Sequence, residues 1–263
     1  MLLTKLSHLS AKLPPQHFIG IGGIGMSAIA EVMLALGVPV SGSDVGNVAD
    51  NYNLARLEKL GAKIYQGHKA EQVPEDAMVI YSSAIKPDNP ALEVAIKRGQ
   101  ATRSRAELLA NFCREFVTFK VTGTHGKTTT TALLGELLGS AGLSPTIING
   151  GIITKHATNA VLRDSSYWVV EADESDGTMN LLPGLVGVIT NIEPEHLDYY
   201  GTAQAMEQAY VAYVRGLPLA GAAVVCIDDV TVRRLLPQFN HPHVITYGLS
   251  EAAQVRALNI KTV

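Results

Sequence analysis

One stretch of the sequence, residues 116–138, constrains the fold more than any other. Apolar and polar residues alternate from Phe116 to Val121, the pattern of a β-strand with one buried face. Two glycines, Gly123 and Gly126, then turn the chain into a segment whose leucines have helical spacing. A strand, a glycine turn, a Lys-Thr pair and a helix form the layout of a phosphate-binding loop. The sequence therefore predicts an α/β domain built around such a loop.

The residue types in this loop suit a bound phosphate chain. Glycines let backbone N–H groups converge on phosphate oxygens, and the start of the following helix adds unpaired donors and the positive end of its dipole. Lys127 is placed to reach the terminal phosphates, and the Thr128 hydroxyl is placed to bind Mg²⁺. The usual pattern has a further glycine five residues before Gly126, where this chain has Val121. A glycine- and threonine-rich turn without a ligand is the alternative interpretation.

A second glycine-rich loop lies near the start of the chain. A short strand leads into Gly20-x-Gly22-x-x-Gly25, and apolar residues with helical spacing follow. The next strand ends in Asp44, 19 residues beyond Gly25. This layout is the fingerprint of a dinucleotide site, with the diphosphate on the helix start and Asp44 on a ribose hydroxyl. From the residues alone, a dehydrogenase that binds NAD here is one hypothesis.

Strands and helices alternate along the rest of the chain. We therefore predict an α/β fold with a Rossmann-like domain over residues 1–113 and a P-loop ATPase-type domain over residues 114–263. Ser83 follows the strand at 78–81, and the carboxyl ends of parallel strands bind ligands, although an ordinary turn fits equally well. His68 could touch the same ligand, but a solvent-exposed loop histidine is the favoured interpretation.

The predicted boundary lies near Cys113, where the second run of strands is about to begin. Residues 103–107 lead towards it, and we interpret their charges as a solvated helix start.

Acidic side chains follow two strands of the second domain. The apolar strand 167–170 is followed by four carboxylates between Glu171 and Asp176. Such a cluster is costly unless a cation or solvent relieves the repulsion, and an acid beside a phosphate loop is half of the magnesium site in many P-loop enzymes. An exposed acidic turn is the alternative. The strand 185–190 leads to His196, which is either a metal ligand or a solvated loop histidine.

Composition excludes several classes of protein. A formal net charge of −3 gives no support to nucleic-acid or anionic-membrane binding. The two cysteines have no metal-ligand spacing, no apolar run approaches the ~18 residues that span a membrane, and Met1–Leu13 is too polar for a signal peptide. We expect a soluble cytoplasmic protein with buried, reduced thiols.

Read together, these motifs resemble those of the Mur ligase family. The segments that carry the resemblance are Gly20–Ser27, Ser41–Asp44, Ser82–Ile85, Gly123–Thr129, Glu171–Asp176, Thr190–Glu193 and His196–Asp198. The resemblance covers the chain from about His17 onwards. One position departs from it, since the run that begins at Thr158 usually continues with Arg and here has Val161.

The resemblance implies particular ligands for the two loops. The first domain would hold the UDP of a nucleotide-sugar, with contacts from Gly22, Gly23, Ile24, Gly25, Met26, Ser27, Asp44, Ser83 and Ala84. The second would bind ATP through Gly123, Thr124, His125, Gly126, Lys127, Thr128 and Thr129. Thr128 and Glu171 would ligate one Mg²⁺ and His196 a second. Lys127, Glu171 and His196 would be the catalytic residues.

The sequence of Gly20–Ser27 resembles the corresponding segment of the family members that join L-alanine to UDP-N-acetylmuramate. In that reaction the lactyl carboxylate of the sugar attacks the γ-phosphate of ATP, and the amine of alanine then attacks the resulting acyl phosphate. The resemblance also implies an adenine-binding segment and a third domain beyond Val263, so the central domain is expected to be incomplete. A non-catalytic module that binds nucleotide-sugar is the remaining hypothesis.

These implications lead to an expectation for the chain by itself. It should bind the UDP-sugar, bind ATP weakly and fail to form the amide. An uncovered sheet surface would lead to self-association or weak order after about Ala220.

Overall fold

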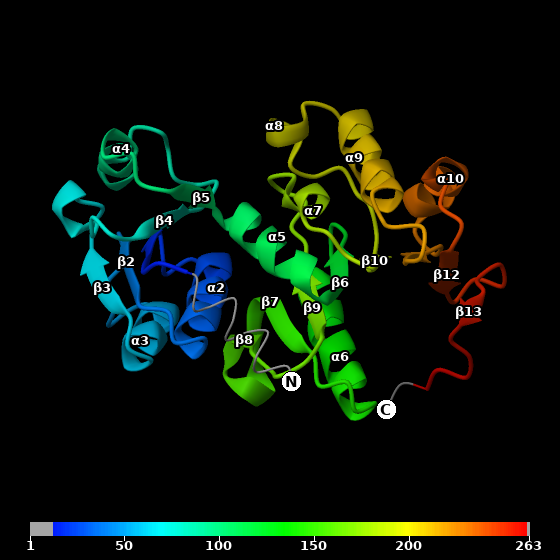
Figure 1. The fold of residues 1–263 in the computed structure, drawn as a ribbon. Helices are drawn as coiled ribbons and strands as arrows, with labels where there is room; N and C mark the ends of the chain where they lie inside the picture. The colour runs from blue at the N-terminus through cyan, green and yellow to red at the C-terminus, as the bar shows by residue number, and fades with distance from the viewer. Residues whose placement is uncertain (1–12, 262–263) are drawn as a thin grey trace.

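The computed structural model describes residues 13–261, which form two parallel-stranded sheets joined by one long helix. The connecting helix, α5 (Arg105–Glu115), lies between the two sheets (Figure 1). Its start is fixed by a capping box, in which the Ser104 hydroxyl accepts the Glu107 N–H and the Glu107 carboxylate accepts the Ser104 N–H. The predicted helix start is confirmed. The sequence did not reveal that this helix lies between the two sheets. The signal-peptide prediction for Met1–Leu13 lies almost wholly outside the described residues.

The first sheet has the strand order β3-β2-β1-β4-β5, and all of its strands are parallel. The strands are β1 (Gln16–Ile19), β2 (Val40–Asp44), β3 (Lys63–Gln66), β4 (Met78–Tyr81) and β5 (Thr102–Ser104). The helices are α2 (Ile24–Ala35), α3 (Tyr52–Lys59) and α4 (Pro90–Lys97), with a 3₁₀ turn, η1 (Ala70–Gln72). The strand order reverses between β1 and β4, the point at which open α/β sheets bind ligands. The Rossmann-like prediction is confirmed.

The second sheet has the order β13-β12-β11-β10-β6-β9-β7-β8, parallel except for the β7–β8 pair. Its strands are β6 (Val117–Thr122), β7 (Thr146–Ile153), β8 (Thr158–Val161), β9 (Tyr167–Glu171), β10 (Val186–Ile189), β11 (Ala222–Cys226), β12 (Val244–Gly248) and β13 (Val255–Arg256). Its helices are α6 (Lys127–Ser140), α7 (Thr178–Leu181), α8 (Leu197–Tyr200), α9 (Ala203–Arg215) and α10 (Val230–Phe239), with the 3₁₀ turn η2 (Thr154–His156). β5, β8 and β13 are short strands that the sequence analysis did not identify.

The prediction that β6 has one buried and one open face is wrong. Its polar residues Thr118, Lys120 and Thr122 are at most 2% exposed, whereas Phe119 is only half-buried. β6 pairs with β10 on one side and β9 on the other, and α5 and α6 both contact it. A central strand that is covered on both faces must bury its polar side chains as well.

The two sheets share one hydrophobic core. Helix α2 of the first part packs on β7 and β8 of the second, and the core cluster is continuous from Phe18 and Ile29 to Ile148 and Trp168. The Trp168 ring stacks on the Phe112 ring, with centroids 5.7 Å apart.

Val161, at the position where the resemblance would place an arginine, packs in a small cluster with Ile147 and Ile153. Because α5 contacts strands of both sheets, the boundary near Cys113 stays a prediction.

Apolar side chains are exposed near the end of the described chain. Leu249, Val255, Leu258 and Ile260 are each more than half exposed. The predicted self-association rests on such surfaces and stays a prediction, as does the cytoplasmic location.

Of the two thiols, Cys113 is buried and Cys226 is partly exposed, so the expectation of two buried thiols is only half right. Between residues 13 and 261 the helices are all too short or too polar to cross a membrane.

Candidate nucleotide-binding site

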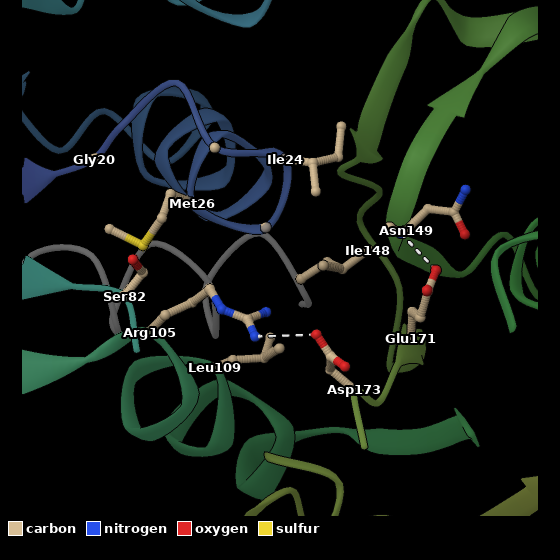
Figure 2. Close-up of a pocket in the computed structure, with 13 residues that line it drawn as sticks. Gly20, Ile24, Met26, Ser82, Arg105, Leu109, Ile148, Asn149, Glu171 and Asp173 are labelled. Atoms are coloured by element: carbon tan, nitrogen blue, oxygen red, sulfur yellow. Dashed lines mark hydrogen bonds and ion pairs between the residues drawn. The ribbon is translucent and has the colours of Figure 1, made fainter. Parts of the chain in front are cut away.

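A cleft of about 190 Å³ extends from the first glycine loop to Glu171 of the second sheet. The first sheet contributes the loop after β1 and the residue after β4, and the second sheet contributes residues 148–150 in the middle of β7 and the end of β9. Figure 2 shows the start of α2 on one side of this cleft and Glu171 with Asn149 on the other. The wall is completed by residues from several elements: Gly20, Gly23, Ile24, Gly25, Met26, Ser82, Arg105, Leu109, Ile148, Asn149, Gly150, Glu171 and Asp173. The cleft thus lies at the carboxyl ends of strands from both sheets.

The start of α2 offers unpaired donors to the cleft. Gly23 is the N-cap residue, no side chain caps the helix, and its first turn contains no acidic residue. The first N–H groups of such a helix have no intrahelical partner and favour an anion. Four of the predicted UDP-sugar contacts, Gly23, Ile24, Gly25 and Met26, line the cleft.

Asp44, Gly22 and Ser27 were predicted to contact the ligand, but in the structure their hydrogen bonds stabilise the first glycine loop itself. One carboxylate oxygen of Asp44 accepts the Gly22 N–H at 2.8 Å, and the other accepts the Gly46 N–H at 2.9 Å. Ser27 is fully buried and donates its hydroxyl proton to the Ile24 carbonyl oxygen. Gly22, Ser27 and Asp44 are therefore outside the cleft lining in this structure.

Ser82, rather than the predicted Ser83 and Ala84, lines the cleft after β4. The Ser83 hydroxyl donates a hydrogen bond to the Asp176 carboxylate at 2.9 Å and so connects the first sheet to the acidic cluster of the second. His68 is half-buried, and its Nδ1 lies 2.8 Å from the Ser43 hydroxyl. His68 lies in a loop, as predicted, but it is not fully solvent-exposed, and burial lowers its pKa.

The phosphate loop has the geometry of an anion cradle. Gly126 has a φ of 80°, a left-handed conformation that glycine adopts freely, and it begins α6 without any side-chain cap. The loop is fixed to the end of β10, because Thr124 N–H donates to the Asn191 carbonyl oxygen and His125 N–H to the Asn191 side chain. Thr124 is buried against Glu193 and Thr129 is exposed. Asn191 is a scaffold residue whose role the sequence analysis missed.

Lys127 is held by its own loop and by Glu174. Its ammonium donates to the Gly123 carbonyl oxygen at 2.7 Å, to the Thr124 carbonyl oxygen at 3.0 Å and to Oε1 of Glu174 at 2.7 Å. Glu174 is 2% exposed. Burial raises the pKa of Glu174, and the Lys127 hydrogen bond and charge oppose that rise.

Glu171 joins the cleft to the phosphate loop. One of its oxygens accepts the Thr128 hydroxyl at 3.1 Å, and the other accepts the Gly150 N–H at 2.6 Å. Burial raises the pKa of Glu171 despite these two hydrogen bonds. A partly buried carboxylate beside a hydroxyl, with no basic side chain bonded to it, is a suitable pair of ligands for a hard divalent cation.

His196 lies in a second group of oxygen and nitrogen ligands. One ligand atom each of Glu174, Glu195 and His196 lies within 4.8 Å of the others. Nε2 of His196 is 3.6 Å from Oε1 of Glu174, and Oε2 of Glu174 is buried without a hydrogen-bond partner among the described residues. An unpaired buried carboxylate oxygen is expensive unless a cation satisfies it. The structure therefore brings His196 to the acidic cluster, as the metal interpretation requires.

Arg105 is a charged cleft residue that was not predicted from the sequence as part of a site. Its interpretation as part of a solvated helix start is wrong, because its side chain is 17% exposed and lines the cleft. It follows the N-cap residue of α5, and the position of that helix between the sheets carries the side chain into the cleft. The charged run at 103–107 was the only sequence signal for it.

Two glycine loops, each at the end of a strand in its own sheet, and a cleft that extends from the first loop to Glu171 define a two-part α/β protein with two candidate phosphate-binding loops. The chain belongs to the Mur ligase family. Residues 15–117 match the family described as "Mur ligase family, catalytic domain", and residues 121–263 match "Mur ligase middle domain". This membership removes the basis for the dehydrogenase hypothesis.

The curated relatives are named as ligases. The chain is 48% identical over 252 residues to a UDP-N-acetylmuramate–L-alanine ligase of a Methylobacterium strain, covering 96% of this chain and 53% of the relative. It is 46% identical to the enzyme of the same name from Rickettsia canadensis, covering 100% of this chain and 54% of the relative. The chain thus spans about half the length of these relatives.

Solved structures agree on the fold. The UDP-N-acetylmuramate-alanine ligase of Thermotoga maritima superposes with a TM-score of 0.80 at 29% identity, covering 90% of this chain and 53% of that one. The UDP-N-acetylmuramate:L-alanyl-gamma-D-glutamyl-meso-diaminopimelate ligase of Neisseria meningitides gives 0.82 at 27% identity, covering 90% and 78%.

Proposed function

We propose that this chain binds UDP-N-acetylmuramate at the first glycine loop and Mg-ATP at the second, in the ATP-dependent ligation of L-alanine to the sugar's lactyl carboxylate. The observation that carries the proposal is the single cleft that extends from the start of α2 to Glu171, which is itself bonded to Thr128 of the phosphate loop. The names of relatives that are 45–49% identical supply the substrates. The product would serve peptidoglycan synthesis.

The proposed ATP phosphates rest on the start of α6. Lys127 would exchange its bond to Glu174 for the terminal phosphates, and the uncapped N–H groups of the first turn would add donors. Asn191 would keep the loop in shape throughout, since it holds the backbone of Thr124 and His125.

Two cation sites fit the side chains that are present. Thr128 and Glu171 offer a hydroxyl and a carboxylate, and Glu174, Glu195 and His196 offer the second set. Oε2 of Glu174 is buried without a hydrogen-bond partner among the described residues although Oε1 accepts from Lys127, and burial raises the pKa of Glu171. A bound cation would stabilise both carboxylates. Mg²⁺ at these positions would neutralise the charge that develops on the transferring phosphoryl group.

The ligation itself depends mainly on positioning. The lactyl carboxylate displaces ADP from the γ-phosphorus to give an acyl phosphate, and the amine of alanine then displaces inorganic phosphate to give the amide. The cleft extends from the start of α2 to Glu171, whose carboxylate accepts the Thr128 hydroxyl of the phosphate loop, and this connection supports a transfer between ligands held at the two loops. The expectation that the isolated chain binds the UDP-sugar without forming the amide stays a prediction.

Calorimetry of the chain with UDP-N-acetylmuramate, and separately with Mg-ATP, tests the proposal. We expect both to bind. Lys127→Met should weaken Mg-ATP at least about tenfold and leave UDP-N-acetylmuramate unchanged, because Lys127 lies outside the cleft lining. Lys155→Met is the matched control, since this exposed lysine pairs with Glu136 on the far part of α6. Equal loss of both ligands, or binding of NADH without UDP-N-acetylmuramate, would contradict the proposal.

A further inference from the structure

The Arg105 side chain is largely buried, yet it donates no hydrogen bond to any residue that the structure describes. Its Nη2 atom lies 3.8 Å from Oδ2 of Asp176 and 4.0 Å from Oδ2 of Asp173, and no hydrogen bond of its side chain occurs among residues 13–261. Hydrogen bonds from nitrogen to oxygen are normally 2.7–3.2 Å long. A guanidinium carries five donors in a planar fork, so this side chain has donors available to a ligand.

The guanidinium lies directly over the third glycine of the first loop. A Cβ atom added to Gly25 would lie only 2.8 Å from Nη1 of Arg105, so the absence of a side chain at Gly25 makes room for the arginine. Figure 2 shows the Arg105 guanidinium between the start of α2 and Asp173. The uncapped N–H groups of α2 and the guanidinium therefore form one electropositive wall of the cleft.

Asp173 and Asp176 lie too far from the Arg105 guanidinium to accept hydrogen bonds from it. Burial by itself raises the pKa of Asp176, but hydrogen bonds from Thr178 and Ser83, together with the Arg105 charge, bring it below its usual value. Each carboxylate oxygen of Asp176 already accepts one hydrogen bond, one from the Thr178 N–H and the other from the Ser83 hydroxyl. Arg105 thus makes two ion pairs, at 3.8 and 4.0 Å, but its side chain donates no hydrogen bond to a described residue.

We propose that Arg105 binds the diphosphate of a nucleoside diphosphate held at the first glycine loop. This inference rests on the proposed function and adds a residue to it. A diphosphate at the start of α2 offers a guanidinium two acceptor oxygens in the bidentate geometry that a lysine cannot reproduce. The same side chain faces Asp173 and Asp176, so it also connects nucleotide-sugar binding to the acidic cluster after β9.

Calorimetry of the full chain with UDP, uridine and UDP-N-acetylmuramate separates the contributions. Arg105→Gln should weaken UDP at least tenfold and leave uridine within twofold, since uridine has no phosphate. Arg105→Lys should recover less than half of the lost binding free energy. Arg103→Gln is the matched control, because this exposed arginine lies two residues away and lines a different cavity, between Leu13 and Phe112. It should bind UDP within twofold of the unmodified chain.

Several results would overturn the inference. Equal losses in Arg105→Gln and Arg103→Gln would indicate only long-range charge attraction, and equal losses of UDP and uridine would indicate a damaged fold. A loss seen with UDP-N-acetylmuramate but not with UDP would place Arg105 on the lactyl carboxylate instead. Unchanged UDP binding in Arg105→Gln contradicts this inference alone, whereas failure of the unmodified chain to bind UDP contradicts the proposed function as well.

Discussion

The ammonium of Lys127 lies 2.7 Å from the carboxylate of Glu174, and this contact closes the phosphate loop onto the acidic cluster after β9. The pair is almost fully enclosed, with side-chain exposures of 16% and 3%. The lysine of the phosphate loop is thus held by a carboxylate from the segment that follows β9. Any phosphate chain that binds at α6 has to compete with that carboxylate for the ammonium.

Removing the charge of Glu174 should strengthen binding of metal-free nucleotide. In the presence of EDTA, we expect Glu174→Gln to bind ATP about three- to tenfold more tightly, because the ammonium is released and a negative charge is removed from the loop. Calorimetry measures the change. Glu193→Gln is the matched control, since Glu193 is exposed and faces His125 instead of Lys127. Weaker or unchanged ATP binding by Glu174→Gln would contradict the competition.

The second cation site should bind metal without nucleotide. We expect Mn²⁺, detected by its electron paramagnetic resonance signal, to bind to the chain alone through Glu174, Glu195 and His196. Glu195→Gln should weaken this binding at least about fivefold, because a neutral amide is a poorer ligand than a carboxylate. Glu193→Gln should have little effect. Equal effects of the two substitutions would mean that the metal responds only to the general negative charge.

The buried Lys120 should make stability depend on alkaline pH. Burial lowers its pKa to about 8 from an ordinary 10.5, and its ammonium donates to the Leu182 carbonyl oxygen at 3.0 Å over the Tyr213 ring. Between these two values the unfolded chain binds more protons than the folded chain, so the cost of burying the charge is complete below pH 8 and disappears as the pH rises towards 10.5.

Lys120→Met isolates this effect. Between pH 7 and 9.5 the unmodified chain should gain about 2 kcal/mol of unfolding free energy relative to Lys120→Met, from about 1.4 kcal/mol per pKa unit. Urea denaturation at several pH values measures it. A constant difference between the two proteins across this range would show that Lys120 keeps its ordinary pKa.

The contact between the two sheets should depend on a charged network. Nη2 of Arg56 on α3 lies 2.9 Å from Oε2 of Glu31 on α2 and 2.6 Å from Oδ1 of Asn159 on β8. Arg56→Met leaves the half-buried Glu31 without its ion-pair partner, although the Thr158 hydroxyl still donates to it, and should cost about 3 kcal/mol of unfolding free energy. The double change Arg56→Met and Glu31→Gln should recover at least half of that loss.

Urea denaturation provides the control for this network too. The exposed pair of Lys97 and Glu93 has the same 2.9 Å separation, and Lys97→Met should cost less than about 1 kcal/mol. A similar small cost for Arg56→Met would mean that the network contributes nothing beyond a surface ion pair.

Local sequence patterns were sufficient for the parts of the site that lie within one strand–turn–helix unit. Gly126, Lys127 and Thr128 follow from a single loop. The side chains of Thr202 and Asp229 cap the helices α9 and α10 that follow them, which is likewise a local interaction. The carboxyl-end rule for parallel strands is also sufficient to predict that Glu171 and His196 lie beside the phosphate loop. These features depend on neighbours in the chain or on a general property of parallel sheets.

Tertiary structure decided which residues from distant parts of the chain meet. By itself, the sequence determined two α/β units, their glycine loops and the acids at their strand ends, because hydrophobic periodicity and turn chemistry act over a few residues. It did not determine that Glu174 holds Lys127, that Asn191 shapes the phosphate loop, or that α5 carries Arg105 into the cleft. Nor did it show that β6 is covered on both faces and buries Lys120. Those contacts depend on how the two sheets pack against each other, and that packing is fixed by the whole core.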